Sequence, residues 1–219
     1  MRKLTSIFAV LLGIVTSAEA QTRDLKKWEV SGSASLLQAH PGSTDEGRYQ
    51  DDWYTEGRYA FAIGRYWTEH LKSEVEYARS GEGSLYHQET RSFPGPADYP
   101  FYFESYHRLE QVSARMVWQF GTNNWVHPYV SGGLVGDRER QRVHIPQQYQ
   151  YPSGRAGDRV LLVDEQNPAP TSEYRVGFTA ATGAKIYMTR NTFFNTGVIA
   201  TYSKPAATIS FLAGLGIDF

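Results

Sequence analysis

The chain runs to Phe219 through the stretch Ile209-Ser210-Phe211-Leu212-Ala213-Gly214-Leu215-Gly216-Ile217-Asp218-Phe219. Apolar residues occupy every odd position of this stretch, and small or polar residues occupy the even positions apart from Leu212. Successive side chains of a β-strand point to opposite faces, so a period of two indicates a strand with one apolar face. The stretch therefore predicts a β-strand that continues to the last residue.

The same alternation recurs upstream and predicts eight strands in all. They lie near 28–36, 56–67, 71–77, 111–120, 125–142, 173–186, 194–202 and 209–219. Strands of globular proteins usually span about 5–6 residues, whereas strands that cross a bilayer need about 9–11. Most of the predicted strands are of the longer kind. The predicted fold class is all-β: an eight-stranded antiparallel transmembrane up-and-down β-barrel.

The connections between these strands differ in length in a regular way. Short connections are expected around 68–70, 121–124 and 189–192, and long loops near 38–53, 81–103 and 144–171. Transmembrane barrels show the same alternation, with short periplasmic turns and longer extracellular loops. The alternative fold is a soluble periplasmic β-sandwich or lipocalin-like binder, in which the apolar faces of the strands would point inward.

The first twenty residues have the composition of a secretory signal peptide. Arg2-Lys3 precedes an apolar run at 7–15, and Ala18-Glu19-Ala20 matches the small-x-small cleavage pattern. We expect cleavage after Ala20, which leaves 21–219 as one barrel domain.

The 219-residue chain has no Cys and a net charge of −1. This composition excludes a disulfide scaffold and gives no electrostatic basis for binding nucleic acid.

The polar faces of the predicted strands are rich in Gly, Ser, Ala and Thr and carry single charges of both signs. The interior of an eight-stranded barrel is only wide enough for side chains, and a buried charge costs several kcal/mol unless it is paired. We therefore expect a closed lumen with a paired network of charges. The candidate interior charges are Glu29, Arg58, Lys72, Glu74, Glu76, Arg115, Arg175, Lys185 and Asp218. Three further charges are expected on a solvated rim: Lys27, Glu56 and Glu173.

Two stretches resemble the small bacterial outer-membrane β-barrel proteins, the porin-like "outer membrane protein β-barrel domain" group. The strand that ends on Phe219 resembles their C-terminal assembly signal, with Phe211, Leu215, Ile217 and Phe219 as its residues. The segment 127–134, His-Pro-Tyr-Val-Ser-Gly-Gly-Leu, is similar to a Pro-Tyr-Val-Gly-x-Gly-Leu strand of that group, with Ser131 in place of the first Gly. The resemblance implies a monomer in the bacterial outer membrane. Its implied partners are outer-membrane lipids and, during biogenesis, the barrel-assembly machinery.

No motif indicates a catalytic residue, a cofactor site or a metal site, and we expect that the protein is not an enzyme. Four residues separate His127 from Ser131, a distance of about 13 Å along a strand. That distance is too long for the hydrogen bond between a nucleophile and its base. A lipid A-modifying enzyme on a barrel scaffold and a small-solute transport barrel are the alternative functions.

The long connections are rich in aromatic residues next to Pro. We predict a contact surface formed by Phe93, Tyr99, Phe101, Tyr102, Phe103, Tyr149 and Tyr151. Exposed aromatic side chains supply contact area for proteins or glycans. In the alternative, they pack against one another and cap the mouth of the barrel. The sequence thus predicts a structural role or a surface-interaction role, in which the ligand is an extracellular protein or glycan.

Overall fold

The computed structural model describes residues 27–40, 53–92, 98–121, 125–150 and 160–219. The predicted signal peptide and its cleavage site lie outside the described residues. No helix in the described part of the chain is long and apolar enough to cross a membrane.

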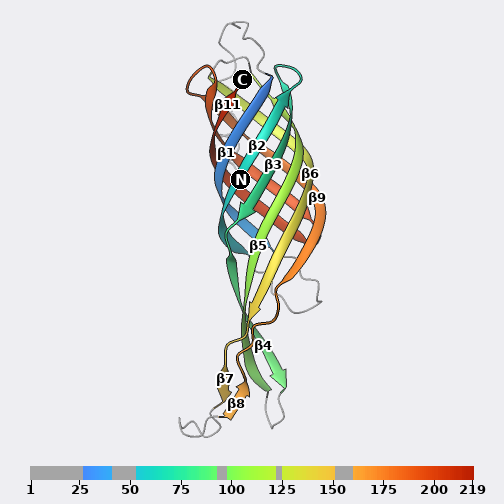
Figure 1. Ribbon diagram of the computed structural model, residues 1–219, viewed down its shortest axis with the longest axis vertical. Coiled ribbons are helices and arrows are strands. Elements are labelled where there is room, and N and C mark those ends of the chain that lie inside the picture. The colour runs from blue at the N-terminus through green and yellow to red at the C-terminus, as the bar shows by residue number, and fades with distance from the viewer. Residues whose placement is uncertain (1–26, 41–52, 93–97, 122–124, 151–159) are drawn as a thin grey trace, which may run out of the picture.

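Eleven β-strands follow one another in the described residues (Figure 1). They are β1 (Trp28–His40), β2 (Tyr54–Tyr66), β3 (Leu71–Ser80), β4 (Gly83–Ser92), β5 (Asp98–Gln119), β6 (Val126–His144), β7 (Gln148–Gln150), β8 (Val160–Val163), β9 (Thr171–Tyr187), β10 (Thr192–Ser203) and β11 (Ala206–Asp218). Strands β7 and β8 form a small sheet of their own, and the other nine form the main sheet.

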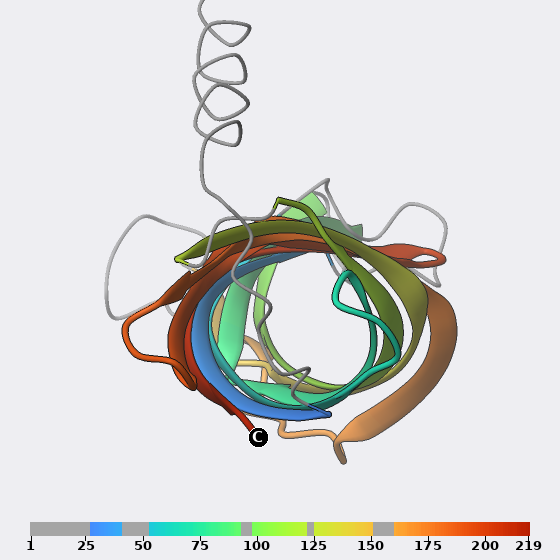
Figure 2. The same ribbon diagram turned by 90° about the horizontal axis from the view of Figure 1, so that it is seen from above.

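The main sheet closes on itself. Its order is β3-β2-β1-β11-β10-β9-β6-β5, and β3 also pairs with β5, so eight of the described strands form a ring that excludes β4. All of these pairings are antiparallel, including the pairing of the first strand with the last, in which Glu29 lies opposite Asp218. Figure 2 shows the ring from above. The predicted all-β, eight-stranded antiparallel barrel is confirmed.

The barrel is apolar outside and polar inside. On β11 the side chains of Phe211, Leu215 and Ile217 are exposed, whereas Ser210 and Asp218 are buried. The other wall strands alternate in the same way. A soluble sandwich or a lipocalin-like binder would place the apolar faces inward, so this arrangement excludes the alternative fold. It is the arrangement of a barrel whose outer wall meets lipid.

The two ends of the barrel differ. The short connections at 67–70 and 188–191 and the C-terminal Phe219 lie at one end, which we call the turn end (Figure 1). Exposed aromatic side chains gather there, namely Trp28, Trp67, Trp118, Phe120 and Trp125. Strands β4, β7 and β8 project beyond the opposite end, which we call the hairpin end (Figure 1). Transmembrane barrels have short periplasmic turns and longer extracellular connections, so we expect the hairpin end to be the extracellular one.

The structure differs from the predicted loops at the hairpin end. Most of 81–103 belongs to β4 and to the first part of β5, which pair from Gly83↔His107 to Ser92↔Asp98. The side chains of Phe101, Phe103 and Leu109 are buried on one face, but the polar Ser105 and His107 share that face with them. These two polar residues interrupt the apolar alternation, and for that reason the sequence does not reveal the strand.

Candidate functional site

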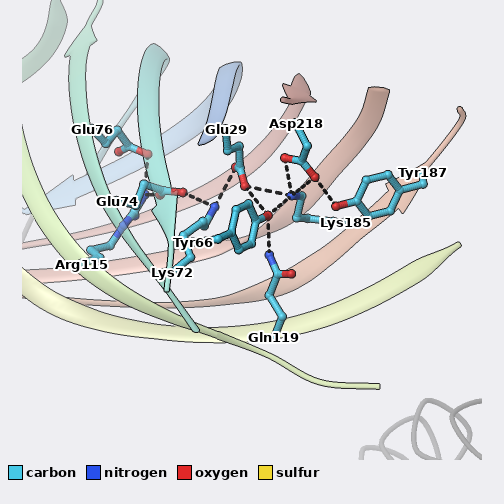
Figure 3. Close-up of polar contacts among 10 residues, drawn as sticks. All are labelled: Glu29, Tyr66, Lys72, Glu74, Glu76, Arg115, Gln119, Lys185, Tyr187 and Asp218. Carbon is cyan, nitrogen blue, oxygen red and sulfur yellow. Dashed lines mark hydrogen bonds and ion pairs between the residues drawn. The ribbon is translucent and has the colours of Figure 1, made fainter. Parts of the chain in front are cut away.

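The lumen holds a row of charged side chains of alternating sign, and Figure 3 shows the part of this row from Glu76 to Asp218. Its members, in order of contact, are Arg58, Glu76, Arg115, Glu74, Lys72, Glu29, Lys185 and Asp218. Four cations thus alternate with four anions, and six wall strands supply them. We call this set the luminal chain.

Every contact along the luminal chain has the geometry of a hydrogen-bonded ion pair. The N···O distances run from 2.6 Å for Arg58–Glu76 to 3.2 Å for Lys185–Asp218. Glu74 accepts from both Arg115 and Lys72, at 2.6 Å each. A charge that has left water needs an ion-pair partner, because an uncompensated charge in the interior is strongly destabilising. The hydrogen bonding is incomplete, since Nε and Nη1 of both Arg58 and Arg115 are buried without a hydrogen-bond partner among the described residues. The sum of the eight charges is zero, so the luminal chain gives the lumen no preference for cations or anions.

Aromatic side chains enclose the luminal chain at the turn end. The ammonium of Lys185 donates to the Tyr66 hydroxyl at 2.7 Å and lies 3.7 Å from the ring centre of Phe193. The Tyr187 hydroxyl donates to Asp218. A Cβ added to Gly216 would lie 2.1 Å from the Phe193 ring, so only glycine leaves space for that ring at this position. These aromatic groups thus pack around the terminal ion pair of the luminal chain, Lys185–Asp218.

A second polar cluster lies nearer the hairpin end. His107 Nδ1 contacts Glu139 Oε1 at 2.7 Å, and Glu139 also accepts from Arg175. On the other side of the ring, His107 Nε2 lies 2.9 Å from the hydroxyl of Ser105. Ser105, His107 and Glu139 thus have the order of a hydrolase triad. The side chain of Ser105 is 0% exposed, however, and His87 Nε2 lies 2.7 Å from the same hydroxyl. A buried hydroxyl in this network offers no access to a substrate, so the geometry is that of a structural hydrogen-bond chain.

An apolar cluster lies beside these histidines at the hairpin end. It consists of the buried residues Leu37, Ala39, Tyr54, Leu85 and Leu109. The Tyr54 ring stacks on His107 at 5.5 Å between centres.

Beside the luminal chain, a cavity of about 20 Å³ lies among Ser33, Lys72 and Arg115. A single water molecule needs about 10–15 Å³ by this measure, so the cavity has room for a water molecule and not for an organic solute.

The structure places the predicted interior charges together. Eight of the nine form the luminal chain, and Arg175 belongs to the second cluster with Glu139. Of the predicted rim charges, Lys27 and Glu173 are exposed and Glu56 is half-buried. Sequence reasoning missed the polar residues that complete the network: Tyr66, Ser105, His107, Gln111, Gln119, Asp137, Glu139 and Tyr187. The sequence does contain a signal for them, namely their even or odd position along the strand. Each lies on the same strand face as a predicted interior residue or a buried neighbour.

The predicted contact surface is wrong for two of its residues. Phe101 is 2% exposed and Phe103 is 8% exposed, because both lie on the inner face of β5. Tyr102, on the outer face, is half-buried and stacks on the exposed Tyr86 of β4. Tyr149 on β7 is half-buried. Phe93, Tyr151 and the side chain of Tyr99 lie outside the described residues. The four residues of the predicted assembly signal, Phe211, Leu215, Ile217 and Phe219, are all exposed on the outer wall.

A closed barrel with an apolar outer wall and a paired polar lumen defines a class, the transmembrane β-barrels. A family model, "Outer membrane protein beta-barrel domain", matches residues 7–217. The chain therefore belongs to the outer membrane protein β-barrel domain family, and it is a protein of the bacterial outer membrane. A search of the curated proteins finds no match.

Solved structures of small outer-membrane barrels are similar to this chain. Neisserial surface protein A (NspA) is 16% identical, with a TM-score of 0.53, and the match covers 88% of this chain and 97% of that chain. The outer membrane protein OprG from Pseudomonas aeruginosa is 12% identical, with a TM-score of 0.51 and coverage of 92% and 99%. Ail, the attachment invasion locus protein of Yersinia pestis, is 10% identical, with a TM-score of 0.50 and coverage of 89% and 100%. At these identities the likeness shows the fold.

Proposed function

We propose that this protein is a closed outer-membrane barrel that serves as a rigid support for its extracellular hairpins. The luminal chain carries this proposal, because its ion pairs and the aromatic groups around Lys185 occupy the space that a channel would need. The apolar cluster around Tyr54 and Leu109 adds a second obstruction at the hairpin end. The support has a structural role in the membrane, and the hairpins carry a surface for interaction with other molecules.

The closed lumen predicts that the folded protein does not conduct ions. In planar bilayers that contain the refolded wild type, we expect single-channel recordings at the background level. The comparison is a variant that carries Arg115→Ala and Arg58→Ala. It removes the two largest cations of the luminal chain and so opens space beside the cavity. Steady conductance steps of the wild type in several preparations would refute the closed lumen and favour the small-solute transport barrel.

The interaction role belongs to the outer face of the β4–β5 hairpin. Tyr86 is 61% exposed and lies against Tyr102, with 5.9 Å between ring centres. The side-chain amide of Gln148 on β7 bonds to the backbone of Tyr102, accepting from its N–H at 3.0 Å and donating to its C=O at 2.6 Å. This link ties the β7–β8 hairpin to the β4–β5 hairpin. An exposed tyrosine that stacks on a half-buried one is a low-entropy contact surface for a protein or a glycan.

Replacing Tyr86 and Tyr102 together by Ser is expected to abolish ligand capture without loss of the folded barrel. The measurement is adhesion of cells that display the protein to a panel of immobilised extracellular proteins and glycans, with equal surface expression verified. Gln88→Ser is the matched control, because Gln88 is exposed on the same hairpin and pairs with Tyr102 in the register. Capture that is equal for wild type, double variant and cells without the protein would contradict the interaction role.

We also propose that the outer face of β11 acts as the assembly signal that the barrel-assembly machinery binds. Phe219 is exposed, and its backbone pairs with Trp28 at 2.8–2.9 Å, so the last residue completes the seam between β1 and β11. Deletion of Phe219 is expected to slow membrane insertion several-fold in a pulse-chase experiment while the finished barrel stays folded. Insertion of the deletion variant at the wild-type rate would contradict this proposal.

A further inference from the structure

Four arginines lie together on the outer wall at the hairpin end. Arg108 belongs to β5, and Arg138, Arg140 and Arg142 follow one another at alternate positions of β6. Their sequence neighbours Leu109 and Glu139 are buried, so the arginines are on the opposite, outward face of their strands. We call this set the rim arginine cluster.

The rim arginine cluster begins where the apolar wall ends. On β5 the outward residues Met116 and Val112 are exposed and apolar, and the next outward residues are Glu110 and Arg108. On β6 the exposed Val130 and Leu134 precede Arg138 in the same way. An apolar band about 25 Å tall covers the hydrocarbon core of the membrane. The first charged residues beyond that band lie at the level of the lipid headgroups.

Two of the four arginines are held by contacts within the protein. Arg138 pairs with Glu110 at 3.5 Å and lies 5.7 Å from the ring centre of Tyr174. Arg142 pairs with Glu82 at 3.1 Å and lies over the ring of Tyr106 at 4.5 Å. These contacts fix the flanks of the cluster and place two tyrosines at the same level, which is the usual position of aromatic residues at a membrane interface.

The two central arginines face each other without an anion between them. Arg108 and Arg140 are direct partners in the register of β5 and β6. Neither forms an ion pair with any residue in the described part of the chain. Like charges directly opposite each other destabilise an antiparallel pair. An anion bound between the two guanidinium groups would offset that repulsion, and the planar fork of Arg suits the oxygens of a phosphate.

We propose that Arg108 and Arg140 bind a phosphate group on the headgroup of an outer-leaflet lipid, and that Arg138 and Arg142 flank this site. The position of the cluster at the edge of the apolar wall selects a lipid over a soluble anion, since acyl chains of a bound lipid would lie along Val112 and Leu134. Arg79 also pairs with Glu110, and Glu104 accepts from the Tyr106 hydroxyl on the same outward face. Five arginines and three glutamates therefore give this part of the wall a net charge of +2, which favours an anionic headgroup. This site is separate from the proposed contact surface at Tyr86 and Tyr102, so either proposal can fail alone.

The test uses the full-length barrel in phosphatidylcholine nanodiscs titrated with bisphosphorylated lipid A, with bound lipid counted by native mass spectrometry. The variant carries Arg108→Gln and Arg140→Gln, and we expect its apparent dissociation constant to rise at least about tenfold, since hydrogen bonds to charged groups are lost. Arg65→Gln is the matched control, because Arg65 is an exposed arginine on the outer wall at the turn end, where it lies over Trp67. The control should bind lipid A as the wild type does.

Two further binding measurements distinguish which chemical group the site recognises. Dephosphorylated lipid A should bind the wild type as weakly as bisphosphorylated lipid A binds the double variant. Inorganic phosphate at millimolar concentration should not displace the bound lipid. The proposal is overturned if the double variant retains wild-type affinity, or if the phosphate-free lipid binds as tightly as the phosphorylated one. Displacement by inorganic phosphate alone would overturn the assignment to a lipid headgroup.

Discussion

Replacing Lys185 by Met is expected to destabilise the folded barrel by about 3–5 kcal/mol, because the change leaves buried carboxylates without their cation. Lys185 is 1% exposed, and its ammonium lies 2.9 Å from Glu29 and 3.2 Å from Asp218. Glu29 keeps Lys72 as a partner at 2.7 Å. Within the described part of the chain, the Asp218 carboxylate keeps the hydroxyl of Tyr187 as its side-chain partner, so most of the cost falls on this carboxylate.

The measurement is urea unfolding of the barrel in lipid vesicles, followed by the gel shift between folded and unfolded protein. Adding Asp218→Asn to Lys185→Met should recover part of the loss, because the second change removes the uncompensated charge. Arg79→Ala is the control on the outer wall, where the pair with Glu110 spans 3.6 Å and an exposed pair contributes at most about 1 kcal/mol. A Lys185→Met barrel as stable as the wild type would show that the luminal chain does not hold the barrel together.

Replacing Phe178 by Arg is expected to cost about 2–4 kcal/mol, because it places a charge on the lipid-facing wall near the middle of the bilayer. Phe178 is 69% exposed and lies on β9 between the outward residues Ile186 and Tyr174. In a soluble protein, a surface position this exposed would tolerate Arg with little change. The sign and size of the effect therefore test which solvent the outer wall meets.

Two matched variants separate charge from size and depth. Phe178→Leu removes the ring but keeps an apolar side chain, and its free energy of unfolding should change far less than that of Phe178→Arg. Tyr174→Arg introduces the same charge at the edge of the apolar wall, where the expected cost is about 0–1 kcal/mol. All three are measured by the same unfolding assay in vesicles. Equal effects of Arg at 178 and at 174 would contradict a depth-dependent lipid environment.

The inner and outer faces of the barrel wall can be predicted from the alternation of residue types along each strand. In the predicted strands near 56–67, 71–77 and 209–219, one parity is apolar and the other is small or charged, so each strand assigns its own inner and outer face. For this reason the charges from Glu29 to Asp218 could be chosen before their partners were known. Parity gives no distances, however, and it could not show that Glu29, on the first strand, contacts both Lys72 and Lys185.

The hairpin end was harder to predict because its strands leave the membrane. Beyond the apolar wall, one face of β4, β5 and β6 meets water and the other face meets the second polar cluster. Apolar and polar residues therefore no longer alternate along these strands. Phe101 and Phe103 share a buried face with Ser105 and His107. The Pro-rich neighbourhood of these aromatics suggested an exposed loop, whereas pairing between β4 and β5 turns them inward.

The sequence alone is sufficient to predict the fold class, the number of wall strands and the face that each wall residue occupies. These follow from local alternation, because the lipid outside and the narrow lumen inside place opposite demands on successive residues. The tertiary structure is needed to show which charges meet, that Arg108 and Arg140 face each other, and that Phe101 and Phe103 are buried. Those properties depend on strand register and on closure of the sheet between β1 and β11, which bring together residues far apart in the chain.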